Sequence, residues 1–216
     1  MRPSIAGYGA RLTHVRVGPD VVALWQVDDL ERYVDRRALL AGDETPEPPY
    51  WAHLWAGARV LAAAVPRGPA RAIELGCGLG LPGLVAARRG ARVVFVDRVP
   101  VPLAFVRASA AANRLRAVDL VAADLTSGAF ARRLDLVLLA EVLYEREMLP
   151  AVARTLADLL APEGLALLAD GRRIDTRAFH PELAGLGLSI ETVQHRVEAD
   201  GIGETIALST IRWPSA

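Results

Sequence analysis

The stretch Arg71–Gly83 reads Arg-Ala-Ile-Glu-Leu-Gly-Cys-Gly-Leu-Gly-Leu-Pro-Gly and predicts a sharp turn from a strand into a helix. Residues 71–75 have the pattern of a buried strand, and Pro82 suits the first turn of a helix, where its missing N–H costs nothing. The glycines between them allow a tight turn and let a ligand approach the backbone closely. The helix start also offers unpaired N–H groups and the positive end of a dipole. We therefore expect a nucleotide-type pocket at this turn.

Two kinds of ligand are compatible with the turn. Residues 78–83 match the dinucleotide pattern G-x-G-x-x-G. The run Glu-Leu-Gly-Cys-Gly-Leu-Gly at 74–80 resembles instead the first motif of class I S-adenosylmethionine (SAM) methyltransferases. Glu74 would repel a pyrophosphate but attract the ammonium group of SAM. Dinucleotide folds also tend to begin with this motif, whereas here it lies well inside the chain. We favour SAM, with a NAD-binding oxidoreductase as an alternative.

The composition indicates a globular enzyme. The chain has 216 residues, of which 52% are hydrophobic and 23% charged, and its net charge is +0. Because no excess of positive charge is present, we expect neither a nucleic acid nor a membrane as partner. No long apolar run and no signal-peptide core is visible, so we expect a cytoplasmic protein. Cys77 is the only cysteine, which excludes an intramolecular disulfide and a cysteine metal cluster. We predict no metal site.

Strands and helices alternate from residue 71 onward. The strands that we expect are 71–75, 92–96, 118–122, 134–140 and 165–169, and the helices are 81–89, 100–113 and 146–160. Such alternation predicts a parallel sheet that is buried on both faces. The segments 188–197 and 202–213 flank a turn signal and predict a closing antiparallel hairpin. The fold class is therefore α/β, a mostly parallel, Rossmann-like sheet of the class I SAM methyltransferase type with a C-terminal antiparallel hairpin.

The N-terminal part has a different pattern. Residues 11–17 and 21–27 alternate apolar and polar around a Gly-Pro-Asp turn and predict a β-hairpin. Residues 28–40 have helical spacing after an aspartate that would cap the helix. We expect residues 1–45 to form a small hairpin-and-helix extension, and residues 46–216 to form the SAM-binding domain. The extension would be either a lid or a docking surface.

Acidic residues stand at the ends of the predicted strands, where ligands bind in open α/β sheets. Asp97 follows the glycines at about the spacing of a ribose-binding acid. Asp124 would accept from the adenine amino group, and Leu125 would pack on its ring. Each acid alone would also serve as a helix cap, but as a set beside the glycines they favour cofactor binding. The cofactor residues expected from this reasoning are Glu74, Gly76, Gly78, Gly80, Asp97, Asp124 and Leu125.

Three pieces of the chain resemble the family-16 lysine methyltransferases, a group of seven-β-strand SAM-dependent enzymes. Residues 50–55, Tyr-Trp-Ala-His-Leu-Trp, precede a helix of small residues, as the group's tryptophan-bearing segment does. Residues 74–80 are similar to its first motif. Residues 140–145 are similar to its Asp/Glu-x-x-Tyr motif. The resemblance implies that Trp55, the three glycines, Asp97 and Leu125 hold SAM. From the residues alone, the simpler interpretation of Trp55 is a core residue, and an indole that lines the cofactor pocket is the alternative.

The same resemblance implies roles for Glu141 and Tyr144 as the catalytic residues that face an acceptor lysine. A lysine must lose its proton before it accepts a methyl group, and burial in a narrow channel favours its neutral form. Glu141 would receive and orient the ammonium group, and Tyr144 would add a cation–π contact. From the residues alone, Glu141 would also serve as a loop acid that anchors the backbone, and Tyr144 as a core residue. S-adenosylhomocysteine (SAH) would be the product.

Within the group, Pro-Pro-Tyr-Trp at 48–51 and Asp-Gly-Arg at 170–172 resemble the branch that methylates the β-subunit of electron transfer flavoprotein. This branch implies a protein as the partner, with that subunit as the candidate substrate. Two other interpretations stay open beside the oxidoreductase. One is a SAM-dependent methyltransferase of a small amine or hydroxy metabolite, and the other is a catalytically idle SAM-fold partner protein.

Overall fold

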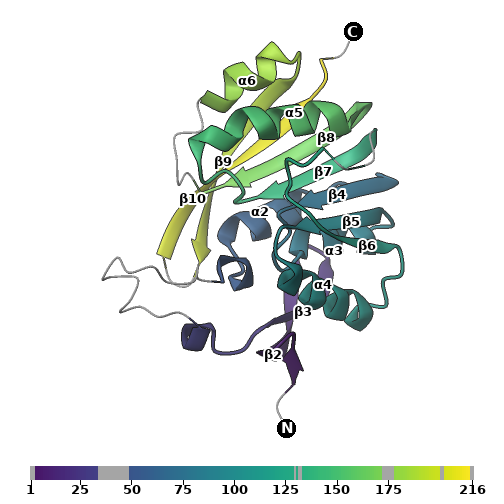
Figure 1. Ribbon diagram of the computed structural model, residues 1–216, viewed down its shortest axis with the longest axis vertical. Helices are drawn as coiled ribbons and strands as arrows, with labels where there is room; N and C mark the ends of the chain where they lie inside the picture. The colour runs from purple at the N-terminus through teal and green to yellow at the C-terminus, as the bar shows by residue number, and fades with distance from the viewer. Residues whose placement is uncertain are drawn as a thin grey trace.

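The computed structural model describes residues 3–33, 49–128, 130, 133–171, 178–199 and 202–214. Its centre is a seven-stranded sheet with helices on both faces (Figure 1). The strands are β4 (Arg71–Leu75), β5 (Arg92–Asp97), β6 (Val118–Ala122), β7 (Leu134–Ala140), β8 (Leu160–Asp170), β9 (Ser189–Ala199) and β10 (Ile202–Arg212). They are ordered β6-β5-β4-β7-β8-β10-β9; β4 to β8 run parallel, and β10 is antiparallel to both its neighbours. The predicted α/β fold with a C-terminal hairpin is confirmed.

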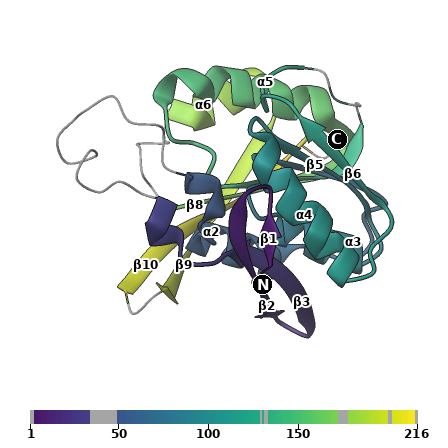
Figure 2. The ribbon, with the colours of Figure 1, turned by 60° about the horizontal axis from the view of Figure 1, so that its bottom comes forward.

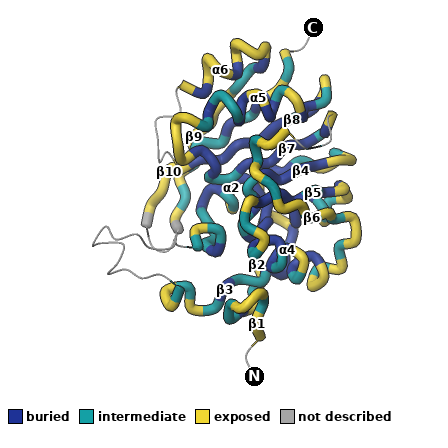
Figure 3. The backbone as a smooth tube through the Cα atoms, viewed as in Figure 1, coloured by how far each residue is buried: buried dark blue, intermediate teal, exposed yellow. Residues whose placement is uncertain are grey.

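Alternation along the strands creates a separate core on each face of the sheet. In β7, Leu136 and Leu138 join the core on one face, and Val137 and Leu139 join the core on the other. The first face is covered by α2 (Ala56–Ala64), α3 (Leu81–Arg88) and α4 (Pro100–Ala112), and the second by α5 (Leu149–Leu159) and α6 (Phe179–Gly185). Figure 3 shows the inner strands buried, whereas β6, at the edge of the sheet, is largely exposed. Burial on both faces explains the nearly continuous apolar runs.

Two elements of the sheet domain differ from their predicted bounds. The helix expected at 146–160 begins with a 3-10 turn, η3 (Arg146–Met148), and becomes α-helical only at Leu149. Pro150 lies in the first turn of α5, where a residue without an N–H is tolerated. Strand β8 begins at Leu160, before the expected start, because the pairing register shifts between Leu134 and Leu136 of β7 and extends the ladder.

The N-terminal part forms a small antiparallel sheet of β1 (Ser4–Ile5), β2 (Tyr8–Val17) and β3 (Asp20–Val27). The predicted hairpin is thus present, with an additional short strand. The α-helix predicted at 28–40 is wrong in its described part: a 3-10 turn, η1 (Leu30–Tyr33), stands there, and residues 34–40 lie outside the described residues. Asp29 has φ 54°, a left-handed conformation that a right-handed helix cannot include. The division at residue 45 stays a prediction.

In the part of the chain that the structure describes, none of the helices has the length and apolar character needed to cross a bilayer. The same residues contain no group of three or more His, Cys, Asp and Glu side chains placed to hold a metal ion.

Candidate active site

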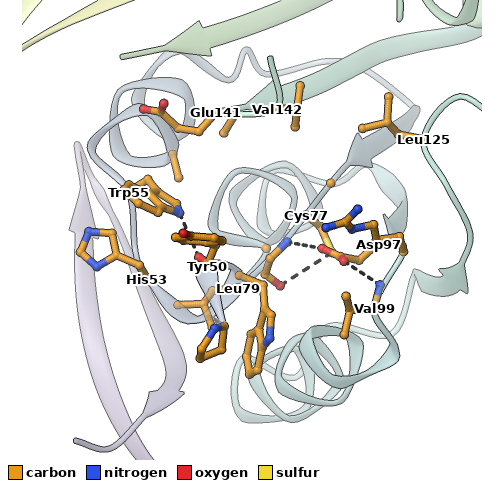
Figure 4. Close-up of a pocket in the computed structure, with 18 of the residues that line it drawn as sticks. Tyr50, His53, Trp55, Cys77, Leu79, Asp97, Val99, Leu125, Glu141 and Val142 are labelled. Atoms are coloured by element: carbon orange, nitrogen blue, oxygen red, sulfur yellow. Dashed lines mark hydrogen bonds between the residues drawn. The ribbon is translucent and has the colours of Figure 1, made fainter. Parts of the chain in front are cut away.

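A cavity of about 880 Å³ lies beyond the carboxyl ends of β4, β5, β6 and β7. This size suits a small molecule or cofactor, and this edge of the sheet is where such ligands bind in open α/β folds. The segment before α2 closes its other side (Figure 4). Every predicted site residue except Glu74 lines the cavity: Trp55, Gly76, Gly78, Gly80, Asp97, Asp124, Leu125, Glu141 and Tyr144.

The glycine loop depends on the absence of side chains. Gly76 and Gly78 have φ values of 62° and 49°, in the left-handed region. A Cβ atom on Gly78 would lie 3.0 Å from the carbonyl oxygen of Trp51, and one on Gly76 would lie 2.8 Å from Cγ1 of Val142. The loop is therefore packed directly against the segments that form the other walls of the cavity.

Asp97 stands at the end of β5 and fastens the glycine loop to that strand. Its Oδ2 accepts a hydrogen bond from the Gly78 N–H at 2.9 Å, and its Oδ1 accepts one from the Val99 N–H at 3.0 Å (Figure 4). Burial raises the pKa of Asp97, and these two N–H groups oppose the shift. Each carboxylate oxygen has a second lone pair, so the group can also accept from hydroxyls of a ligand in the cavity.

Glu74 is placed differently from the prediction, because it does not line the cavity. Its side chain is almost completely buried, and its Oε2 accepts a hydrogen bond from the Gly83 N–H in the first turn of α3 at 2.8 Å. Side chains alternate between faces along a strand, so Glu74, which precedes the last residue of β4, points at α3 and not off the edge of the sheet. Burial raises the pKa of Glu74 to about 8. Glu74 is a helix cap beneath the loop.

Glu141 lines the cavity but is also held by the backbone on both sides. Its Oε1 accepts from the Gly57 N–H, in the first turn of α2, and its Oε2 accepts from the Gly171 N–H after β8, each at 3.1 Å. Glu141 has φ 57°, and its own N–H donates to the Ala169 carbonyl at 2.8 Å. The left-handed turn at the end of β7 thus directs the carboxylate back across the sheet edge. That Glu141 anchors the backbone was the structural alternative from its residue type, but no local pattern predicts Gly57 and Gly171 as the partners.

Trp55 stands at the same side of the cavity as Glu141 (Figure 4), and Tyr144 also lines the cavity. Trp55 precedes α2, and its indole Nε1 donates to the carbonyl of Tyr50 at 3.1 Å while His53 packs edge-on against its ring at a centroid distance of 4.4 Å. Tyr144 is 39% exposed, which places an accessible aromatic ring at the cavity mouth. Trp55 also lines the cavity, and this residue is half-buried.

Asp124 and Leu125 follow β6. Oδ1 of Asp124 accepts from both the N–H (2.8 Å) and the hydroxyl (2.5 Å) of Thr126, and these hydrogen bonds lower the pKa of Asp124. Asp124 therefore closes its own turn in addition to lining the cavity. Leu125 is half-buried and lies over the glycine loop, with Cδ2 3.8 Å from the Cβ position of Gly76.

Sequence reasoning missed four Tyr and Trp residues that line the cavity, namely Tyr8, Tyr33, Tyr50 and Trp51. They come from β2, η1 and the 3-10 turn η2 (Tyr50–Ala52). Tyr8 and Tyr33 lie in the region predicted to be an extension outside the cofactor domain, and their spacing in the sequence does not indicate a cavity. The only available hint was the aromatic run that contains Trp51.

Comparison with known proteins agrees with this geometry. Residues 72–164 match the family described as a methyltransferase domain. The chain is 38% identical over 108 residues to the protein N-lysine methyltransferase METTL21A of Danio rerio, a stretch that covers 46% of this chain and 48% of that protein. It is 31% identical over 146 residues to the EEF1A lysine methyltransferase 3 of Mus musculus, covering 58% and 62% of the two chains. The matches thus span about half to three fifths of these relatives.

Among solved structures, the N-methyltransferase NodS of Bradyrhizobium japonicum in complex with SAH superposes with a TM-score of 0.61 at 20% identity, covering 86% of this chain and 97% of that one. The 16S rRNA N2 G1207 methyltransferase RsmC of T. thermophilus, in complex with AdoMet and guanosine, gives a TM-score of 0.63 at 18% identity, with 97% and 51% covered. The fold is therefore that of the class I SAM methyltransferases.

Proposed function

We propose that this protein is a SAM-dependent methyltransferase that transfers methyl groups to a lysine side chain of a protein. The observation that carries the proposal is that carboxylates stand at both ends of one cavity. Asp97 and the glycine loop stand at one end, and Glu141 with Trp55 stands at the other (Figure 4). A donor and an acceptor that share such a cavity would therefore meet different carboxylates.

The residues at the Asp97 end fit the donor. A ribose would meet the Asp97 carboxylate, an adenine ring would meet Leu125 and Asp124, and the amino-acid part would lie along the loop backbone at Gly76 and Gly78. When bound, SAM supplies a methyl group on a sulfonium, which is a good leaving group. The protein must therefore mainly align the two reactants.

Glu141 has the chemistry to receive an acceptor ammonium. The Gly57 and Gly171 N–H groups fix the direction of its carboxylate before any substrate arrives. Each oxygen of a carboxylate can accept more than one hydrogen bond, so an ammonium group can share these oxygens with backbone N–H groups. Tyr144, exposed at the mouth, adds an aromatic face for a cation. A lysine held against these groups and shielded from water would favour the neutral amine.

A protein acceptor is supported by the named activities of the two relatives, a protein N-lysine methyltransferase and an EEF1A lysine methyltransferase. The sequence motifs at 48–51 and 170–172 make the β-subunit of electron transfer flavoprotein the first candidate acceptor. The single cysteine, Cys77, fits a reducing compartment, and a cytoplasmic location is part of the proposal.

The test is incubation of the purified protein with methyl-labelled SAM and a lysate of the source organism, followed by separation of proteins from small molecules. We expect label on a protein, at lysine, and its loss with Glu141→Ala. The sequence contains no lysine, so self-methylation of lysine side chains cannot produce the signal. Label found only in small molecules would contradict the protein acceptor and favour a metabolite methyltransferase.

A further inference from the structure

We infer that the N-terminal sheet is a fixed wall of the donor pocket, and that Tyr8 and Tyr33 contact the nucleoside half of the donor. The identity of that donor as SAM rests on the proposed function. The attachment of the sheet, the positions of the rings and their place in the cavity rest on independent contacts.

The sheet is attached to α4 by side chains that continue its hydrogen bonding. The amide of Asn113 pairs with Ala23 of β3 in both directions: Ala23 N–H donates to Oδ1 at 3.0 Å, and Nδ2 donates to the Ala23 carbonyl at 2.6 Å. The hydroxyl of Ser109 accepts from the Trp25 N–H at 2.9 Å. Two side chains of α4 thus form the hydrogen bonds with the edge of β3 that a neighbouring strand would otherwise form.

A buried ion pair adds a second attachment, at the end of α3. Asp20, the first residue of β3, lies 2.8 Å from Nη2 of Arg89, and the two side chains are only 11% and 10% exposed. Arg89 also donates to the carbonyl of Val65. Lifting the sheet would break this ion pair together with the hydrogen bonds to α4. Figure 2 shows β3 lying alongside α4 and α3. The sheet is therefore part of the rigid body and not a lid.

The rings of Tyr8, Tyr33 and Trp51 form a series of aromatic contacts between this sheet and α4. Tyr8 lies 4.7 Å from Tyr33 and 5.4 Å from Trp51, measured between ring centroids, and Trp51 lies 5.3 Å from Phe105 of α4. The hydroxyl of Tyr33 accepts from the Gly9 N–H at 2.9 Å. Each ring therefore has a fixed position before a ligand binds.

The backbone of Trp51, whose ring contacts Tyr8 and Phe105, adjoins the Asp97 end of the cavity. The carbonyl of Trp51 stands against the glycine loop at Gly78, and the N–H of Gly78 donates to Asp97. The Glu141 end is tied instead to Gly57 and Gly171. Since aromatic faces stack on nucleobases and pack on the apolar face of a sugar, the rings of Tyr8 and Tyr33 are suited to the nucleoside and not to the acceptor.

The test is calorimetric titration of the full chain with SAH. Tyr8→Ala should weaken binding by about tenfold or more, the scale of one lost aromatic contact to a nucleoside. The matched control is Leu12→Ala, because Leu12 lies on the same strand, is 41% exposed and does not line the cavity. We expect it to bind SAH like the unchanged protein. Equal affinities for the two variants would overturn the inference and leave the proposed function intact.

Hydrogen exchange on the unchanged protein gives a second measurement that does not depend on a variant. SAH should slow amide exchange at Gly9, whose N–H is bonded to Tyr33, more than at the distal end of β2 near Val15. No difference between these two positions would overturn the inference. Failure of the unchanged protein to bind SAH would contradict both the inference and the proposed donor. SAH binding without transfer to lysine would contradict the proposed function alone.

Discussion

A glutamate side chain holds the first turn of α3 and another holds the first turn of α2, but one of them is buried and the other faces the cavity. Glu74 of β4 accepts from the Gly83 N–H of α3, and Glu141, directly after β7, accepts from the Gly57 N–H of α2. Glu74 is 1% exposed and sealed beneath the loop, whereas Glu141 opens into the cavity. A carboxyl oxygen at a helix start can accept a hydrogen bond from an unpaired N–H group in either setting. Only the open one can also meet a substrate, so position relative to the sheet edge separates the two roles.

The largest expected effect is on catalysis at Glu141. Glu141→Ala should reduce turnover by about a hundredfold or more, the scale of a positioned polar catalytic group. Transfer of labelled methyl groups to the protein acceptor measures it. Turnover close to that of the unchanged protein would show that Glu141 only braces α2, as Glu74 braces α3.

A matched pair of glycine substitutions separates the two helix starts. In Gly57→Ala the new methyl would overlap Oε1 of Glu141, and in Gly83→Ala it would meet Phe95 and Glu74 in the core. We expect Gly57→Ala to reduce turnover about tenfold through the displaced carboxylate. Gly83→Ala should mainly lower the free energy of unfolding, by about 1–3 kcal/mol for an overpacked site. Thermal melts and turnover of both variants check this, and similar profiles for the two would contradict the distinction.

The pH dependence of stability should report on Glu74. Its pKa is raised by burial to about 8 from 4.5, so the folded state holds a proton that the unfolded state releases between these values. The free energy of unfolding should therefore fall as pH rises from about 4.5 to about 8, and level off above it. Glu74→Gln should remove this part of the slope. Urea titrations at several pH values measure it, and an unchanged slope in the variant would assign the effect to other groups.

The smallest expected effect concerns Tyr144. If its ring and not its hydroxyl meets the acceptor, Tyr144→Phe should keep turnover within about threefold because the aromatic face remains. Tyr144→Ala should raise the KM for the acceptor while the affinity for SAH stays the same. A large loss of turnover with Tyr144→Phe would instead give the hydroxyl a direct role in the transfer.

The sheet could be predicted from sequence because its signals are local. The turn at 71–83 and the apolar runs that follow it each define one βα unit, and parallel strands place their ends at a common edge. This argument predicts that Asp97, Asp124 and Glu141 lie close together, and all three line one cavity. It failed for Glu74 because one residue of offset along a strand reverses the direction of a side chain.

The N-terminal wall could not be predicted for a different reason. Tyr8 reaches the cavity because Asn113 and Ser109 of α4, together with Arg89 at the end of α3, hold β3 in place. Contacts between positions so far apart in the chain leave no periodicity in either segment. In the same way, the hydrogen bonds that Glu141 accepts from Gly57 and Gly171 depend on a left-handed turn in a residue type that rarely adopts one.

Side-by-side titration of Asp97→Ala and Glu141→Ala with SAH tests most directly whether the cavity has separate donor and acceptor ends. We predict that Asp97→Ala loses about a hundredfold or more in affinity, because it removes a charge-assisted acceptor and a support of the glycine loop. Glu141→Ala should bind SAH within a few-fold of the unchanged protein. Equal losses in the two folded variants, or a larger loss for Glu141→Ala, would contradict the account.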